Sequence, residues 1–311
     1  MLYQISLVLR HLPRVGISSL NQMLSSGKNF VLALYLVRVL DPVDFGLYGI
    51  GMAFVLLYAG IGNALLLTQM VVRMPEERDT NRPSYCANML ALCFAFMILT
   101  LLVALIAIPL VQLWMPAELT ADFIFSIAFA GVGTLATNYF VRLAYSNFEE
   151  FNALLVHTVS FIVLLASLWI VEVYANLATA TDVLWLYAIA NFSGAIMGLI
   201  KSSLPLRNIG LAAMQSAFKQ SLYGGRWAVG GVGVTWLQSQ SYIYIASIFH
   251  GAAGIAILNA ARILISPFTF ILPAFTQLLL PRLAQMRVDD PRKLVRMGVL
   301  YGLGLVTCGS I

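Results

Sequence analysis

Long apolar runs, separated by short polar or charged stretches, dominate the chain of 311 residues. A helix needs about 20 mostly apolar residues to cross a bilayer. Runs of roughly that length lie near 15–40, 47–71, 85–113, 123–145, 153–173, 183–204, 227–249, 255–280 and 294–311. None of them shows the strict alternation of a membrane β-barrel. The pattern therefore predicts an all-α polytopic membrane protein with about nine transmembrane helices.

The composition supports this prediction. Hydrophobic residues make up 60% of the chain and charged residues only 10%, whereas a soluble domain carries about 25% charged residues. So few charges cannot cover the surface of a water-soluble protein of this size. The composition therefore excludes a soluble enzyme, a disordered protein and a secreted disulfide scaffold.

The basic residues predict the orientation. With a cytoplasmic N-terminus, most of the 18 Lys and Arg residues fall on the cytoplasmic side, and the predicted outer loops near 114–122, 174–182 and 249–253 contain none. Such a bias follows the positive-inside rule. The net charge of +5 therefore reflects topology, and it implies no nucleic-acid partner.

The predicted spans fall into two groups. Residues 1–206 form a first six-helix half, residues 207–224 an amphipathic cytoplasmic linker helix, and residues 225–311 the first three helices of a second half. Similar turns around Gly46 and Gly254 indicate a parallel internal repeat. Because a complete second half would extend beyond residue 311, we expect a truncated two-half transporter.

Polar residues inside the first predicted span share one face. Ser18, Asn21, Ser25, Lys28 and Tyr35 recur at steps of three, four and seven residues, which places them within a wedge of about 100° on a helix. Lys28 lies near mid-membrane, too deep to reach either surface easily. Two interpretations stay open: a cation in a water-filled cleft that meets an anionic substrate, or a structural lysine bonded to backbone carbonyls or a nearby side chain.

Two later predicted spans carry further polar residues at mid-membrane depth. Such a polar face is typical of a transport pathway, or of polar helix–helix packing. We favour the pathway because a buried arginine is hard to place otherwise. The candidate substrate-binding residues of these two spans are Gln238, Gln240, Asn259, Arg262, Ser266 and Thr269.

Catalytic and metal-binding patterns are missing from the sequence. No Asp or Glu lies deep in a predicted span, so no carboxylate proton relay is visible. No zinc-hydrolase motif, nucleophile elbow, phosphate-binding loop or Cys/His cluster occurs. We therefore expect a transporter rather than an enzyme, without a cofactor or a metal site.

The first outer turn resembles a known family. Its residues run Arg38-Val39-Leu40-Asp41-Pro42-Val43-Asp44-Phe45-Gly46-Leu47-Tyr48. The pattern Arg-x-Leu followed by Asp-Phe-Gly-Leu-Tyr resembles that of polysaccharide-biosynthesis flippases. These are the Wzx-type lipid-linked oligosaccharide (O-antigen) translocases of the multidrug/oligosaccharidyl-lipid/polysaccharide exporter superfamily. The residues that match the family turn are Arg38, Asp44, Phe45 and Gly46.

The resemblance implies two six-helix halves around a central cavity that opens alternately to the two sides of the bacterial inner membrane. It implies an undecaprenyl-pyrophosphate-linked O-antigen or exopolysaccharide repeat unit as the substrate, flipped from the inner to the outer leaflet. Lys28 and Arg262 would then meet the pyrophosphate, and Gln238 and Gln240 the sugar hydroxyls. The implied partners are membrane lipids and the polysaccharide polymerase and glycosyltransferases of the same pathway.

Three alternatives remain at this point. The first is a multidrug extruder of the same superfamily, which would favour an acidic cavity. The second is a membrane glycosyltransferase or polymerase, which would need a large acidic outer loop. The third is a fragment that does not transport.

Overall fold

The computed structural model describes residues 2–77, 81–114, 120–174 and 179–265. The structure is 93% helical, and no strand occurs in these four ranges, which confirms the predicted all-α class. The eight α-helices are α1 (Leu2–Val39), α2 (Pro42–Gly62), α3 (Thr68–Arg73), α4 (Arg82–Trp114), α5 (Ala121–Ser146), α6 (Glu150–Tyr174), α7 (Ala180–Lys201) and α8 (Leu211–Ile265).

Five of the helical segments are long and apolar enough to cross a membrane. They are Pro42–Glu76, Arg82–Leu110, Ala121–Ser146, Glu150–Tyr174 and Ala180–Lys201. These segments coincide with the second to sixth predicted spans. The first and seventh predicted spans are helical, within α1 and α8, but they are not among the five. The last predicted span and most of the eighth lie outside the described residues.

Local sequence explains where several helices begin. The Asp41 side chain accepts hydrogen bonds of 2.8 and 2.9 Å from the backbone N–H groups of Val43 and Asp44, which caps α2. Pro42 occupies the first helical position, where its missing N–H costs nothing. Thr179 and Asp182 form a capping box at the start of α7.

A π-helical segment, η1 (Asn63–Leu67), joins α2 to α3 without a loop. The N–H of Thr68 bonds to the carbonyl of Asn63, five residues earlier, instead of four. The path then ends in a short 3-10 helix, η2 (Met74–Glu76). The predicted second span is therefore one continuous helical path with an internal change of winding.

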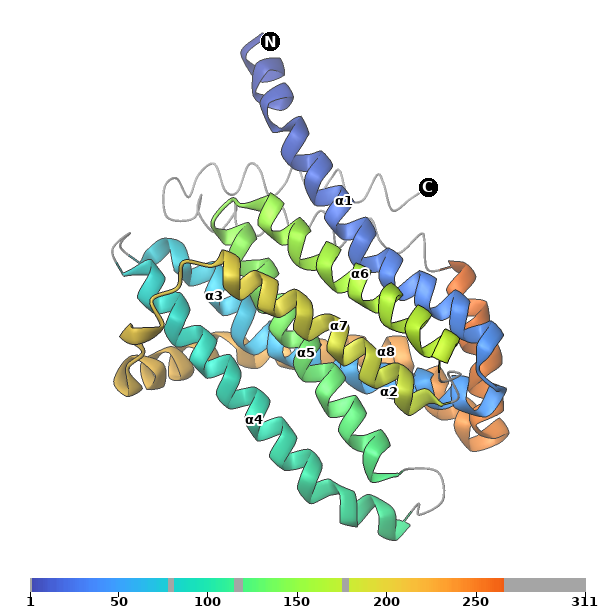
Figure 1. Ribbon diagram of the computed structural model, residues 1–311. Helices are drawn as coiled ribbons and strands as arrows, with labels where there is room; N and C mark the ends of the chain where they lie inside the picture. The colour runs from blue at the N-terminus through green and yellow to red at the C-terminus, as the bar shows by residue number, and fades with distance from the viewer. Residues whose placement is uncertain (1, 78–80, 115–119, 175–178, 266–311) are drawn as a thin grey trace.

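Helices α5 and α7 form the centre of the bundle, with α6 beside them and α4 at its edge (Figure 1). One cluster of buried side chains around Met70, Met89 and Tyr139 joins α3, α4 and α5. A second cluster around Leu36, Phe45 and Leu184 joins α1, α2 and α7. The first six predicted spans thus pack into one bundle.

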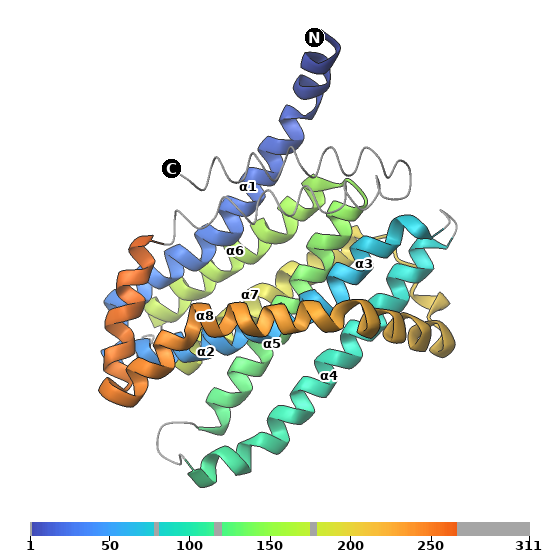
Figure 2. The same cartoon turned by 180° about the vertical axis from the view of Figure 1, so that it is seen from behind.

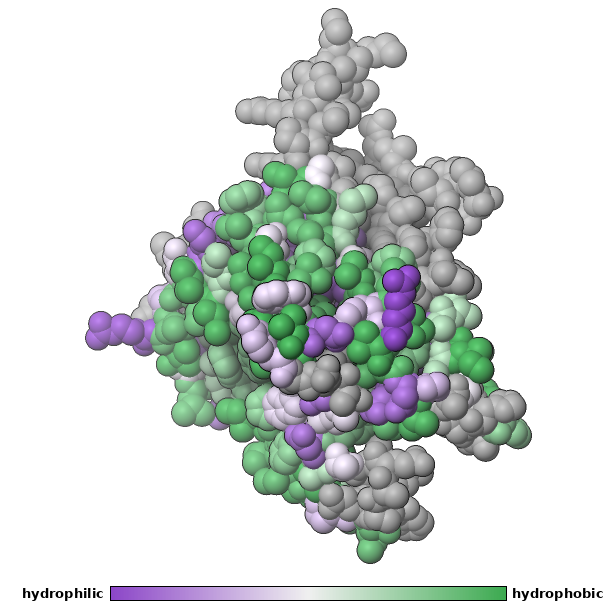
Figure 3. All heavy atoms as spheres, turned by 45° about the vertical axis from the view of Figure 1, so that its right-hand side comes forward, coloured by the Kyte–Doolittle hydropathy of each residue, from purple (hydrophilic) through white to green (hydrophobic). Residues whose placement is uncertain are grey.

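Apolar side chains also cover much of the outside. Green, hydrophobic atoms dominate the face in Figure 3, with polar residues scattered among them. On α4, the side chains of Ile98, Val103 and Ile106 are more than half exposed. A helix that exposes so many large apolar residues would be unstable in water, whereas it suits a lipid environment.

Helix α8 runs for 55 residues. The sequence predicts a linker helix, a span, an outer loop at 249–253 and a further span in this region. The structure assigns helix without a break from Leu211, after a short 3-10 turn (η3, Leu206–Asn208), to Ile265. The last part of α8 nevertheless turns away from the rest (Figure 2). The linker and the seventh span are therefore one helix, because neither a proline nor an acidic cap interrupts residues 211–249.

Helix α8 packs along α2 and η1 through glycines. A Cβ at Gly225 would lie 3.0 Å from the Leu65 Cα, and a Cβ at Gly60 would lie 2.9 Å from a Val232 methyl group. The Gln69 side chain sits directly against Gly224. Glycines let helix backbones approach closely, a common form of packing within membranes.

Candidate functional site

A pocket of about 180 Å³ lies between α1, α2 and α8. Most of its lining is aromatic or aliphatic, the phenol ring of Tyr48 included, and four further residues carry an amide or a hydroxyl group. No charged residue is among the described residues that line it. The four polar residues are Ser26, Asn29, Gln240 and Asn259.

Asn259 lies where α8 meets α2. Its side-chain oxygen accepts a 3.2 Å hydrogen bond from the Tyr242 hydroxyl. Its amide nitrogen is buried and has no hydrogen-bond partner within the described part of the chain. A Cβ on Gly49 would overlap this amide, so a larger residue there would require the Asn259 side chain to move. The pocket therefore contains a buried donor that a ligand or a water molecule can satisfy.

Gln240 and Gln238 lie on opposite sides of α8, as a separation of two residues, about 200° on a helix, requires. Gln240 is 3% exposed and lines the pocket, whereas Gln238 is exposed outside it. Four residues before Gln240, the Trp236 indole donates a 2.8 Å hydrogen bond to the carbonyl of Ala53 on α2. This bond helps to fix the face of α8 that looks toward the pocket. Of the two predicted glutamines, the structure brings only Gln240 to it.

Helix α1 presents two adjacent polar rows. The predicted row, which includes Asn21 and Lys28, faces the first bundle, whereas Ser26 and Asn29 face the pocket. The Gln22 amide donates a 2.9 Å hydrogen bond to the Ser26 hydroxyl. The sequence analysis missed this second row, although the i, i+4, i+7 spacing of residues 22, 26 and 29 could have revealed it.

Lys28 does not line the pocket. It is 4% exposed, and its ammonium donates hydrogen bonds of 2.9 Å to the Ser160 hydroxyl and 2.8 Å to the Asn191 side-chain oxygen. The ammonium also lies 4.9 Å from the centre of the Tyr187 ring, an attractive cation–π distance. This arrangement corresponds to the structural interpretation of Lys28, in which nearby side chains hold the cation.

The other predicted residues of α1 are also separate from the pocket. Asn21 is buried and donates a 2.8 Å hydrogen bond to the Tyr145 hydroxyl on α5. Ser25 is partly exposed and does not line the pocket. Asn21 and Lys28 thus bond across the first bundle, to α5, α6 and α7.

The family turn lies at one end of the pocket. Phe45 is 3% exposed and lines it, while Gly46 is buried. Asp44 accepts a 2.8 Å hydrogen bond from the backbone N–H of Ala180, at the start of α7. Arg38 is exposed. The turn therefore ties α2 to α7, a structural function for Asp44.

Three predicted residues are not placed. Arg262 falls within α8, but its side chain is not described, and Ser266 and Thr269 lie outside the described residues. Among the described residues, no group of three or more His, Cys, Asp or Glu residues is arranged to hold a metal ion.

The pocket combines apolar walls with neutral hydrogen-bonding groups. Amides and hydroxyls can donate to and accept from hydroxyl groups, and the apolar walls can contact alkyl chains or sugar ring faces.

Comparison with known proteins finds no matching family model, no matching curated protein and no matching solved structure.

Proposed function

We propose that the protein is a membrane transporter that flips an undecaprenyl-pyrophosphate-linked oligosaccharide between leaflets, with the pocket between α1, α2 and α8 as part of its sugar path. The observation that carries the proposal is the Asn259 amide nitrogen, which has no hydrogen-bond partner in the described part of the chain and lies in a neutral, apolar-walled pocket. A sugar offers several hydroxyls that can pair with such groups. The resemblance of the Arg38–Tyr48 turn to polysaccharide flippases supports the same substrate class.

The pocket lies between α1–α2 and α8, which belong to the two predicted halves. Transporters built from repeats bind substrate at the interface between repeats. The arrangement of Gln240 and Asn259 on α8 against Asn29 on α1 is consistent with this scheme. Lys28 is not required to touch the pyrophosphate, because side chains of the first bundle already hold its ammonium.

Complementation tests the proposal. The protein is expressed in a bacterial strain that lacks its own oligosaccharide flippase, and surface polysaccharide is measured. We expect restored polysaccharide, and a loss of about fivefold or more with Gln240→Leu combined with Asn259→Leu, because two neutral hydrogen bonds are removed. Gln238→Leu is the matched control, since Gln238 is exposed outside the pocket.

The outcomes separate the alternatives. Failure of the unmodified protein to restore polysaccharide in strains with different repeat units would contradict the flippase proposal. Resistance to lipophilic cations without restored polysaccharide would favour a multidrug extruder, which the aromatic and aliphatic wall of the pocket could serve. If the Gln238 control and the pocket variant lost equal amounts of surface polysaccharide, the pocket would not be part of the sugar path.

A further inference from the structure

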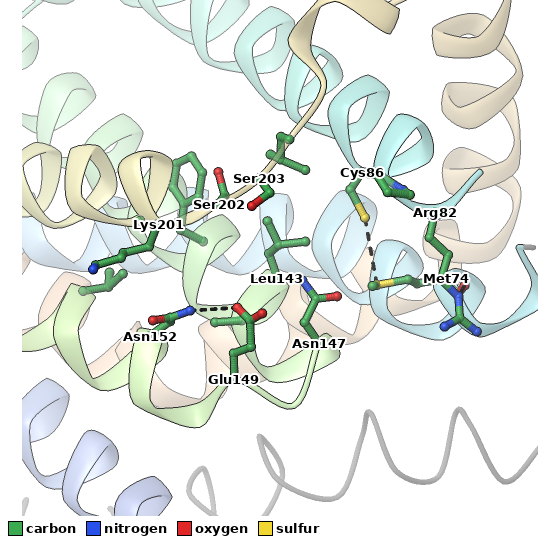
Figure 4. A pocket seen from close by; sticks show the side chains of 16 residues that line it. Met74, Arg82, Cys86, Leu143, Asn147, Glu149, Asn152, Lys201, Ser202 and Ser203 are labelled. Carbon is green, nitrogen blue, oxygen red and sulfur yellow. Dashed lines mark hydrogen bonds between the residues drawn. The ribbon is translucent and has the colours of Figure 1, made fainter. Parts of the chain in front are cut away.

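A second cavity, of about 290 Å³, lies at the ends of α4, α5, α6 and α7. In Figure 4, Asn147 and Glu149 approach it from the turn between α5 and α6, and Ser202 and Ser203 face it from the segment after α7. Lys201, the last residue of α7, stands at its edge. Its deeper walls are apolar and include Phe140, Leu143 and Val156.

The turn that carries Glu149 has a defined geometry. Phe148 adopts a φ of 59°, a left-handed conformation that is unusual for a non-glycine residue. The N–H of Glu149 donates a 2.8 Å hydrogen bond to the carbonyl of Ala144. The Asn152 amide then donates a 2.8 Å hydrogen bond to one carboxylate oxygen of Glu149. This network holds the carboxylate at the cavity.

Three charged residues line this cavity: Arg82 and Lys201 are basic, and Glu149 is acidic. The Arg82 side chain is engaged within the protein, where its Nε donates a 3.2 Å hydrogen bond to the carbonyl of Met74. Neither Lys201 nor Glu149 forms an ion pair with another residue that the structure describes. Both residues are exposed, so their charged groups are accessible to a ligand from outside the chain. A ligand that carries both an anionic and a cationic group would complement the two residues at once.

The cavity lies at the ends of the membrane-spanning helices, and this position indicates that its ligand is a membrane lipid. Four candidate spans begin or end around it: Arg82 opens one, Ser146 closes the next, Glu150 opens the third and Lys201 closes the fourth. The cavity therefore lies where the apolar spans meet water, at the depth of lipid headgroups. Its apolar inner walls can contact the first carbons of acyl chains.

We propose that this cavity binds the zwitterionic headgroup of an aminophospholipid, with the ligand's phosphate near Lys201 and the serine hydroxyls and its ammonium near Glu149. A primary ammonium can donate to the carboxylate, whereas a quaternary ammonium cannot. Phosphatidylethanolamine therefore fits better than phosphatidylcholine, and phosphatidylglycerol lacks the cation. The site is separate from the pocket of the proposed transport path and does not depend on which substrate crosses.

Native mass spectrometry of the purified full chain tests the assignment. The protein is titrated with phosphatidylethanolamine, phosphatidylglycerol and phosphatidylcholine of identical acyl chains. We expect phosphatidylethanolamine to bind up to about fivefold more tightly than the other two, the range that one exposed ion pair provides. Water-soluble glycerophosphoethanolamine distinguishes a lipid from a free headgroup, and we expect it to bind far more weakly.

Two variants assign the charges. Glu149→Gln keeps an oxygen for the Asn152 bond but should abolish the preference for phosphatidylethanolamine over phosphatidylglycerol. Lys201→Gln should weaken both lipids. Lys219→Gln, at an exposed lysine of α8 outside the cavity, is the control and should change neither. Equal binding of the three lipids, equal binding of the soluble headgroup, or equal losses in the Lys201 and Lys219 variants would overturn the proposal.

Discussion

The ammonium of Lys28 on α1 donates a 2.8 Å hydrogen bond to the side chain of Asn191 on α7, 163 residues away in the chain. A second bond reaches Ser160 on α6. One buried cation thus connects the first helix of the bundle to two of its later helices. Because its acceptors are neutral side chains of the protein, the cation acts here as a polar link between helices.

Loss of this link should destabilise the bundle. Lys28→Ala leaves buried acceptors on α6 and α7 without a donor, so we expect the free energy of unfolding to fall by about 1–3 kcal/mol. The double variant Lys28→Met with Asn191→Leu replaces one hydrogen-bonded pair with apolar groups and should recover part of that loss, since the Ser160 hydroxyl still lacks its donor. Reversible unfolding in mixed detergent micelles measures each value.

The same variants distinguish a structural from a substrate-binding Lys28. If the lysine only links helices, the double variant should also recover transport in the complementation assay. If the double variant regained stability but did not transport, the result would instead indicate that Lys28 contacts the substrate.

Alanine substitutions at two glycines of α8 should change the stability of the protein in opposite directions. A Cβ at Gly225 would lie 3.1 Å from the Ala64 carbonyl oxygen, so Gly225→Ala must push α8 away from η1. A Cβ at Gly230 meets nothing within 4 Å, so Gly230→Ala should raise stability by about 0.5–1 kcal/mol through lower backbone entropy. Melting temperatures in detergent should therefore fall for the first variant and rise for the second. A rise for both would show that α8 does not pack closely on η1.

Two tryptophans of α8 offer a similar comparison. Trp236 donates to the Ala53 carbonyl, whereas Trp227 is 80% exposed. Trp236→Phe should lower the free energy of unfolding by about 1 kcal/mol, and Trp227→Phe should change it by less than about 0.5 kcal/mol. Unfolding followed by circular dichroism measures both. Similar losses in the two variants would contradict the assigned contact between α2 and α8.

Asp44 should contribute to stability through the start of α7. Its carboxylate accepts a hydrogen bond from the Ala180 N–H, where a negative charge is also favoured by the helix dipole. We expect Asp44→Ala to cost about 1 kcal/mol. Asp44→Asn should cost less, because the amide oxygen can still accept the bond. If both variants matched the unmodified protein in thermal unfolding, the turn would not hold α7.

Periodicity and composition were enough to predict five helical spans and the row of α1 that includes Asn21 and Lys28, but the row of Ser26 and Asn29 was missed. Gln240 and Asn259 were predicted separately, on two spans, and the structure places both in the lining of one pocket. The partners of Lys28 could not be predicted, because helical spacing defines the face of a residue but not the helix packed against it. Gln238 and Gln240 lie about 200° apart on a helix, so spacing predicts that they face opposite sides. Which of them faces α2 became clear only from the Trp236 contact.

Two features of the fold, the π-helix η1 and the continuity of α8, could not be recognised from the local sequence. The residues of η1, Asn63-Ala64-Leu65-Leu66-Leu67, suit an α-helix as well as a π-helix. Helix α8 continues through the predicted boundary between linker and span because Gly225 is held against η1. Tertiary packing thus overrides a weak helix propensity at that glycine pair.

The π-helical turn resets the phase of the second span. Gly60 and Gln69 are nine residues apart, which would place them on opposite sides of a straight helix with about 100° per residue. One extra residue in the turn brings them closer to a shared face, and both contact α8. The same reset directs Leu67 and Val71 into the core of the first bundle. Deleting a single residue within η1 would leave Gly60 and Gln69 eight residues apart, about 80° on a straight helix. A plain α-helical turn should then replace the π-helical one, while the core leucines and Gln69 keep the faces they have now.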